Sequence, residues 1–104
     1  MLNQVTLIGR ITKDIELKTF TVNDETIKKV DFQLAVNSSK DKVDFITCVG
    51  FRKIAENMKS FLKKGSKIAI IGKIKTNSFE KDGKKQFRTY VTVNNMVFLD
   101  KKSD

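Results

Sequence analysis

The sequence predicts an all-β fold, a five-stranded Greek-key barrel with one α-helix between the third and fourth strands. Apolar and polar residues alternate along most of the chain, which is typical of strands with one buried face. Only one segment has the helical spacing of apolar residues, and it lies near the middle of the chain. The length of 104 residues suits a single domain with a modest core.

Three strands are expected before the helix. The first covers residues 4–13, where Val5 and Leu7 begin a series of apolar residues on one parity. The second covers residues 30–36, which alternate cleanly between apolar and polar side chains. A polar turn leads into the third strand over residues 43–51, where apolar residues occupy both parities. This pattern predicts strands that pack one face against a core.

One amphipathic helix is predicted over residues 53–62. Its apolar residues fall at the spacings i, i+1, i+4, i+7 and i+8, which place them on one stripe: Ile54, Ala55, Met58, Phe61 and Leu62. We assign this stripe, Phe61 included, to the core. Lys63 and Lys64 are favourable near a helix C-terminus, and Gly65 suits the left-handed conformation that often ends a helix.

Two further strands are expected after the helix. Residues 67–75 form the fourth strand, and residues 87–99 form the fifth. The segment 80–85 between them predicts a hairpin loop, because its Asp82-Gly83 dipeptide favours tight turns.

The order of elements indicates the type of barrel. Three strands, a helix and two strands fit a barrel of the oligonucleotide-binding (OB) type, with another small barrel or an α+β roll as the alternatives. Gly9 and Gly72 stand alone within strands, where we expect them to mark tight bends. No linker or repeat divides the chain, so we expect one domain over residues 1–100 and a short end over residues 101–104.

The positive charge of the chain is concentrated in one third of the sequence. Lysine and arginine number 21 and aspartate and glutamate 12, so the formal net charge is +9. Residues 52–88 contain twelve basic and three acidic residues, which accounts for the whole excess. Such a segment favours a polyanionic partner. The alternative is a solvated surface that only maintains solubility.

Catalytic and metal-binding chemistry has little support. The chain has no histidine, and its single cysteine, Cys48, lies among apolar strand residues. The acidic residues are scattered, whereas Mg²⁺ sites need clustered carboxylates, and no glycine-rich phosphate loop is present. We therefore expect a non-enzymatic protein without cofactor or metal. No stretch approaches the ~20 apolar residues of a membrane span, and no secretory signal is seen, so we expect a cytoplasmic protein.

Aromatic residues interleaved with basic residues predict a groove for nucleic acid. Phe45 and Phe51 share a parity on the third strand, and Phe79 stands among polar residues. Aromatic rings can stack on bases while cations neutralise phosphates. A place in the core is the alternative for any single phenylalanine, and we assign Phe32 and Phe61 there.

Several segments resemble the bacterial and phage single-stranded DNA-binding protein (SSB) family. They are the opening MLNQVTLIGRITKD, the segments FQLAVN, DFITCVGFRK and AEN, and the run LKKGS. The resemblance extends from residue 1 to about residue 99. It implies an OB barrel that wraps single-stranded DNA without sequence preference in DNA replication, recombination and repair. It also implies a homo-oligomer, with a tetramer favoured and a dimer possible. The first strand could pair across a dimer axis by edge addition.

The resemblance also implies roles for particular residues. Phe45, Phe51 and Phe79 match three of the four stacking positions of the family, and Lys40 stands at the fourth, where we expect a phosphate contact instead. The chain departs from the family in the first connection, which commonly holds an aromatic residue followed by a Pro-Asn-Gly turn; here the sequence is TFTVNDE, in which Phe20 could serve instead. Lys53 and Lys64 match positions that are commonly basic. The full set of basic residues expected to bind nucleic acid is Lys40, Arg52, Lys53, Lys64, Lys73, Lys75, Lys81, Lys84, Lys85 and Arg88.

Other functions stay open on these grounds. The first alternative is a primosomal or other replication-accessory module that acts mainly through protein contacts. An RNA-binding barrel and a phosphodiesterase have weaker support. Family members usually continue into an acidic tip that recruits replication proteins, whereas this sequence closes with DKKSD. We therefore expect no acidic tail, and replication partners are left open. The expected origin is a bacterium, or a phage or mobile element in a bacterial host.

Overall fold

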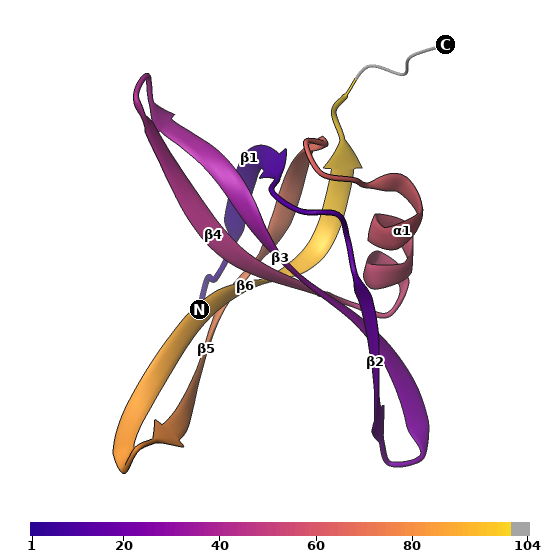
Figure 1. Ribbon diagram of the computed structural model, residues 1–104, viewed down its shortest axis with the longest axis vertical. Coiled ribbons are helices and arrows are strands. Elements are labelled where there is room, and N and C mark those ends of the chain that lie inside the picture. Colours follow the sequence, from indigo (N-terminus) through magenta and orange to yellow (C-terminus); the bar gives the residue numbers. More distant parts are fainter. Residues whose placement is uncertain (101–104) are drawn as a thin grey trace.

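Residues 1–100 are described by a computed structural model, and they form six strands and one helix (Figure 1). In chain order the elements are β1 (Val5–Ile11), β2 (Leu17–Val22), β3 (Glu25–Ser39), β4 (Lys42–Phe51), α1 (Lys53–Phe61), β5 (Lys67–Lys81) and β6 (Lys84–Phe98). This mostly-β architecture with its helix after β4 confirms the predicted fold class. The expectation of no acidic tail concerns residues 101–104 and lies outside the described residues.

The strands form one sheet that closes on itself. β1 pairs with β5, β5 with β6, β6 with β4, β4 with β3, and β3 again with β1. All of these pairs are antiparallel except β4 and β6, which run parallel where Cys48 and Val49 face Val91 and Thr92. The result is a five-stranded barrel of the predicted kind, and β2 extends it beside β3.

β2 is a strand that the hydrophobic pattern does not predict. β1 and β2 both pair with β3, through Ile11↔Leu34 and Leu17↔Val30, so they are two parts of one strand interrupted at residues 12–16. Most of β2 is exposed to solvent. Its sequence therefore lacks the alternation of buried residues by which a strand is recognised.

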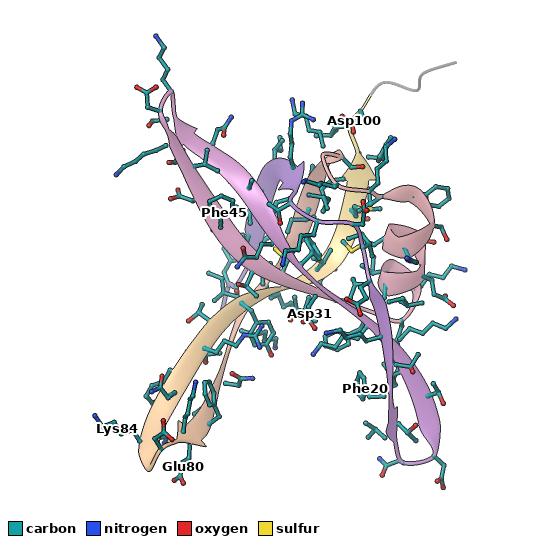
Figure 2. The ribbon with its side chains drawn as sticks, in the orientation of Figure 1. Phe20, Asp31, Phe45, Glu80, Lys84 and Asp100 are labelled. Carbon is teal, nitrogen blue, oxygen red and sulfur yellow. The ribbon has the colours of Figure 1, made fainter. Side chains whose placement is uncertain are left out.

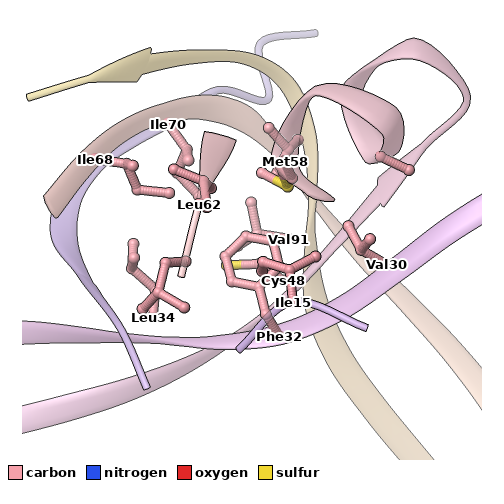
Figure 3. Packing of buried hydrophobic residues seen from close by; sticks show 13 residues of the cluster. Ile15, Val30, Phe32, Leu34, Cys48, Met58, Leu62, Ile68, Ile70 and Val91 are labelled. Atoms are coloured by element: carbon pink, nitrogen blue, oxygen red, sulfur yellow. The ribbon is translucent and has the colours of Figure 1, made fainter. Parts of the chain in front are cut away.

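The core fills the barrel and the space beneath the helix (Figure 3). Inward-facing side chains of β3, β4, β5 and β6 meet Ala55, Met58 and Leu62, all of which are buried. Phe32 is also in the core, as predicted. The assignment of Phe61 to the core is wrong, because this side chain is 67% exposed. It is the last residue of α1 and lies on the margin of the buried stripe.

The helix ends one residue earlier than predicted, because Leu62 has extended backbone angles of φ −109° and ψ 147°. Gly65 adopts a positive φ of 92°, as expected, but it belongs to the following turn. In that turn the backbone N–H of Ser66 donates to the carbonyl of Lys63 at 3.0 Å. The N–H of Gly65 donates to the carbonyl of Ile11 at 2.8 Å, which fastens the turn to β1.

Two glycines permit the closest approaches of backbone in the barrel. A Cβ on Gly9 would lie 2.4 Å from the carbonyl oxygen of Ala35, and one on Gly72 would lie 2.2 Å from that of Thr92. The pairing of β5 with β6 also shifts register between Ile71 and Gly72. Gly72 therefore stands at an irregularity of the strand, and both glycines allow the backbones of neighbouring strands to approach closely; the tight bend expected at Gly9 stays a prediction.

Three long hairpins extend from the barrel: β2–β3, β3–β4 and β5–β6 (Figure 1). The β5–β6 hairpin turns at Asp82 and Gly83, whose φ angles are both positive, as a two-residue turn requires. The segment 80–85 is therefore mostly strand, and Phe79 lies within β5 rather than in a loop. No helix among residues 1–100 has the length and hydropathy needed to cross a membrane.

The burial of α1 gives a first prediction. Met58→Ala should lower the free energy of unfolding by about 2–5 kcal/mol, because it opens a cavity among fully buried side chains. Phe61→Ala, on the same helix but exposed, should change it by less than about 0.5 kcal/mol. Urea unfolding followed by circular dichroism measures both. Equal losses would contradict this arrangement of the helix.

Candidate nucleic-acid interface

Strand register sorts the side chains of the β5–β6 hairpin onto two faces. Residues directly opposite each other in an antiparallel pair share a face, and neighbours along a strand alternate. Lys81 pairs with Lys84 next to the turn. The pairing of β5 with β6 continues from there without a shift as far as Lys73, which pairs with Thr92. One face therefore carries basic and aromatic residues together: Lys73, Lys75, Phe79, Lys81, Lys84, Arg88 and Tyr90.

β4 presents the predicted aromatic residues on its outer face. Phe45 and Phe51 pair with Ala35 and Lys29, whereas the intervening Cys48 points into the core. Phe45 is 60% exposed, and Phe51 is half-buried. Figure 2 shows Phe45 on β4 and Lys84 near the tip of the β5–β6 hairpin. The shared parity of the two phenylalanines therefore places both outside the barrel, as predicted.

The outer face of β4 is continuous with the outer face of the β5–β6 hairpin. The junction is the parallel pair of Val49 with Thr92, both of which lie on the outer parity of their strands, although the Val49 side chain is itself buried. We call the combined surface the outer basic face; its residues are Phe45, Phe51, Lys73, Lys75, Phe79, Lys81, Lys84, Arg88 and Tyr90. It brings together most of the residues that the sequence analysis selected.

The remaining predicted residues lie at the border of this face or away from it. Arg52 and Lys53 follow Phe51 at the start of α1. Lys40 is in the turn at the tip of the β3–β4 hairpin. Lys85 is on the opposite face of the β5–β6 hairpin, with its ammonium 5.6 Å from the centre of the Phe87 ring. Lys64 precedes β5, at the other end of that strand from the hairpin turn.

Ion pairs distinguish two groups of cations. Near the helix, the guanidinium of Arg52 is paired with the Glu25 carboxylate, and Lys28 donates to Glu56 at 2.6 Å. The hydrogen bond from Lys28 is also the main reason that the pKa of Glu56 is lowered. Within residues 1–100 the other ion pairs are Arg10–Asp100 and Lys29–Asp31. None of these pairs involves a cation of the β5–β6 hairpin, so those charges face solvent.

A groove of about 380 Å³ borders the outer basic face. Arg88 of β6 lines it together with Gln33 of β3 and Thr47 of β4. Residues 12–16, which interrupt the first strand, also line the groove, with the exception of Ile15. The hairpin and the body of the barrel thus meet in a hollow rather than on a flat surface.

Phe20 and Tyr90 also lie in this region, although neither is among the residues predicted from the sequence to bind nucleic acid. Phe20 contacts Phe51 edge-to-face, with ring centroids 6.4 Å apart and planes at 77°. Such pairs contribute about 0.5–1.5 kcal/mol beyond area burial. Tyr90 lies on the outer basic face with the Arg88 guanidinium 6.0 Å from its ring centre. Its place could have been predicted from the Asp82-Gly83 turn, because every second residue after Lys84 lies on the same face of the strand, and this series includes Arg88 and Tyr90.

Two kinds of reactive group can be checked directly among residues 1–100, metal-binding clusters and the single cysteine. No three His, Cys, Asp or Glu side chains there are grouped so as to hold a metal ion. Burial raises the pKa of the Cys48 thiol to about 12, so the thiol stays neutral and unreactive at physiological pH. The surface is suited to binding an extended polyanion with flat aromatic groups.

A closed barrel with one parallel pair, and an outer face of cations and aromatic rings, together define an oligonucleotide-binding barrel. Comparison with known families agrees with this class. Residues 2–99 match the model of the Single-strand binding protein family, and the chain belongs to that family.

Curated relatives span most of the chain. A single-stranded DNA-binding protein of Onion yellows phytoplasma is 43% identical over 104 residues, covering 99% of each chain. Single-stranded DNA-binding protein A of Bacillus subtilis is 41% identical over 110 residues, which cover 99% of this chain and 62% of the relative. A single-stranded DNA-binding protein of Clostridium perfringens is 39% identical, covering 95% of this chain and 67% of the relative.

Proposed function

We propose that the chain binds single-stranded DNA without sequence preference and acts through this binding in DNA replication, recombination and repair. The outer basic face carries the proposal, because it offers phosphate-binding cations and base-stacking rings on one continuous surface. The names of the bacterial relatives support single-stranded DNA as the ligand, and the proposed place of action is a bacterial cytoplasm. Binding of this kind needs no catalytic group.

Each part of the outer basic face has a proposed role. Phe45, Phe51 and Phe79 stack on bases, and the hairpin cations neutralise phosphates. Arg52 exchanges its carboxylate partner, Glu25, for a phosphate. The predicted residues away from this face contact a longer strand that continues around the protein; they are Lys40, Lys53, Lys64 and Lys85.

Binding to labelled oligo-dT, measured by fluorescence anisotropy, tests the proposal. If the five cations on the outer face of the hairpin each neutralise a phosphate, log K should fall against log salt with a slope of about −3.5. Raising salt from about 50 to 200 mM should then weaken binding ~100-fold. Binding that is independent of salt would contradict a phosphate-tracking surface.

Competitors in the same assay separate the alternative functions. Duplex DNA should compete poorly, and equal affinity for duplex and single strand would overturn the proposal. Oligo-U that outcompetes oligo-dT would favour RNA as the ligand. Oligo-dT should be recovered intact after incubation with Mg²⁺, since cleavage would indicate a phosphodiesterase. Absence of binding, together with retention of a replication helicase or helicase loader in a pull-down, would favour an accessory module.

Phe79→Ala should weaken oligo-dT binding by about 1–3 kcal/mol, because it removes one stacking platform. Phe79 is 46% exposed on a hairpin outside the core, so folding should be unaffected. Phe61→Ala is the matched control, since Phe61 is an exposed phenylalanine at the end of the helix. If the two variants bind equally well, Phe79 has no stacking role.

We also propose that the chain forms a homo-oligomer through β1 and the sheet surface beside it. β5 covers one edge of β1, whereas β3 pairs with β1 only at Arg10 and Ile11, so part of the other edge has no partner strand within residues 1–100. The adjoining outer surface carries Ile8, Ile71 and Val97, which are 53%, 38% and 50% exposed. An open edge and an apolar face are two separate interfaces, and a tetramer built from dimers needs two.

Light scattering at micromolar concentration tests the assembly. We expect a mass four times the chain mass of 11.9 kDa. If only one interface forms, the mass should be twice the chain mass. Ile8→Glu should lower the mass because it places a charge on the apolar face. Phe61→Glu, which places the same charge on exposed helix surface, should not. A monomeric wild-type protein would contradict the proposal.

A further inference from the structure

An apolar cavity lies where β4 and β6 separate. The two strands pair only through Cys48–Val49 and Val91–Thr92, and before those residues each runs in a different hairpin (Figure 1). The angle between them holds a cavity of about 330 Å³. Aliphatic side chains of four strands line it together with two aromatic residues; they are Val5, Leu7, Ile46, Ile74, Val91, Phe45 and Tyr90.

The lining suits a flat molecule with apolar faces and polar edges. Two aromatic side chains and an aliphatic floor favour a ring, since stacking and apolar contact do not depend on its substituents. Thr47 and Thr89 also line the cavity, and a hydroxyl can both donate and accept hydrogen bonds. The volume lies at the small end of the range for small-molecule sites, which is about 300–1,000 Å³. One nucleobase matches these properties.

Charge and position favour a base that belongs to a bound strand. Phe45 belongs to both the cavity and the outer basic face, so a strand on that face passes the cavity entrance. Lys75 is the cross-strand partner of Tyr90, and the Arg88 guanidinium lies 6.0 Å from the Tyr90 ring. One cation therefore lies over the Tyr90 ring and a second is its cross-strand neighbour, so both are placed to contact phosphates of a strand whose base binds there.

We propose that this cavity is a base-binding slot, in which one nucleobase of single-stranded DNA stacks on Tyr90 beside Phe45. The slot adds a stacking position to the three that the sequence resemblance implies. The proposal rests on the proposed binding of single-stranded DNA and specifies one subsite of it.

Tyr90 provides its own reporter, because it is the only tyrosine and the chain contains no tryptophan. Intrinsic fluorescence excited in the tyrosine band therefore reports on this ring alone. The experiment titrates the protein with oligo-dT, and separately with an abasic deoxyribose-phosphate oligomer of the same length. Anisotropy of end-labelled strands measures binding in parallel, and free tyrosine corrects for absorption by the DNA.

Oligo-dT should quench Tyr90 fluorescence in proportion to binding, whereas the abasic strand should bind more weakly without quenching. Oligo-dT that binds without quenching would overturn the slot and leave the proposed function intact. If neither strand binds, the proposed function itself fails. Equal quenching by both strands would also overturn the slot, since it would show that phosphates alone perturb the ring.

Three variants separate stacking from a structural effect. Tyr90→Leu should weaken oligo-dT binding about 5- to 150-fold and leave abasic binding unchanged. Tyr90→Phe should keep wild-type affinity, because the ring is retained. Phe87→Leu alters an exposed ring on the opposite face of the hairpin and should leave the Tyr90 quenching unchanged. If Tyr90→Leu changes the mass in light scattering but not oligo-dT affinity, a second copy occupies the cavity and the proposal is wrong.

Discussion

The short parallel pairing of β4 with β6 is the constraint on which the rest of the molecule depends. Only Cys48 and Val49 on one strand meet Val91 and Thr92 on the other, yet this contact closes the barrel. Beside this contact, Gly72 lets β5 pack closely against β6, because a Cβ at position 72 would collide with the carbonyl of Thr92. The same contact joins the outer surface of β4 to that of the β5–β6 hairpin. Closure of the core and continuity of the interface therefore have one structural cause.

The alternation of side chains along each strand lets one segment serve two purposes. On β4 the buried Cys48 contributes to the core, while Phe45 and Phe51 on the other parity are available to a ligand. A slip of one residue in register would exchange the two sets. The pairing of β4 with β3 and β6 thus determines both the stability of the barrel and the composition of its outer surface. Beyond the barrel the β5–β6 hairpin has no core of its own, so its exposed cations are free to bind.

The sequence predicted those elements that have one buried and one exposed face, because burial is what leaves a periodic signal. β2 lacks that signal because solvent covers both of its faces. Phe61 was wrongly assigned to the core. Helical spacing identifies which residues of α1 share one face, but it does not show how far along the helix the barrel covers that face. The candidate cations were identified by type, yet their separation into faces depends on the turn. The predicted loop over residues 80–85 does not assign Lys84 and Lys85 to different faces. The observed turn at Asp82 and Gly83 makes both lysines part of β6, where they lie on opposite faces of the hairpin. The cavity beside Tyr90 is formed by strands that are distant in the sequence, so the pattern of any single segment could not predict it.

The placement of acidic residues is consistent with a division between folding and binding. Glu25 and Glu56 pair with cations around the start of α1, where the β2–β3 hairpin meets the helix, and thereby help to hold these parts together. Exposed pairs of this kind contribute little individually, about 0–1 kcal/mol, so a phosphate could replace Glu25 at Arg52 at small cost. On the outer face of the β5–β6 hairpin the cations are paired with no carboxylate of residues 1–100. A bound strand should therefore engage the hairpin first and reach Arg52 by exchange, because only the second contact requires an existing ion pair to break.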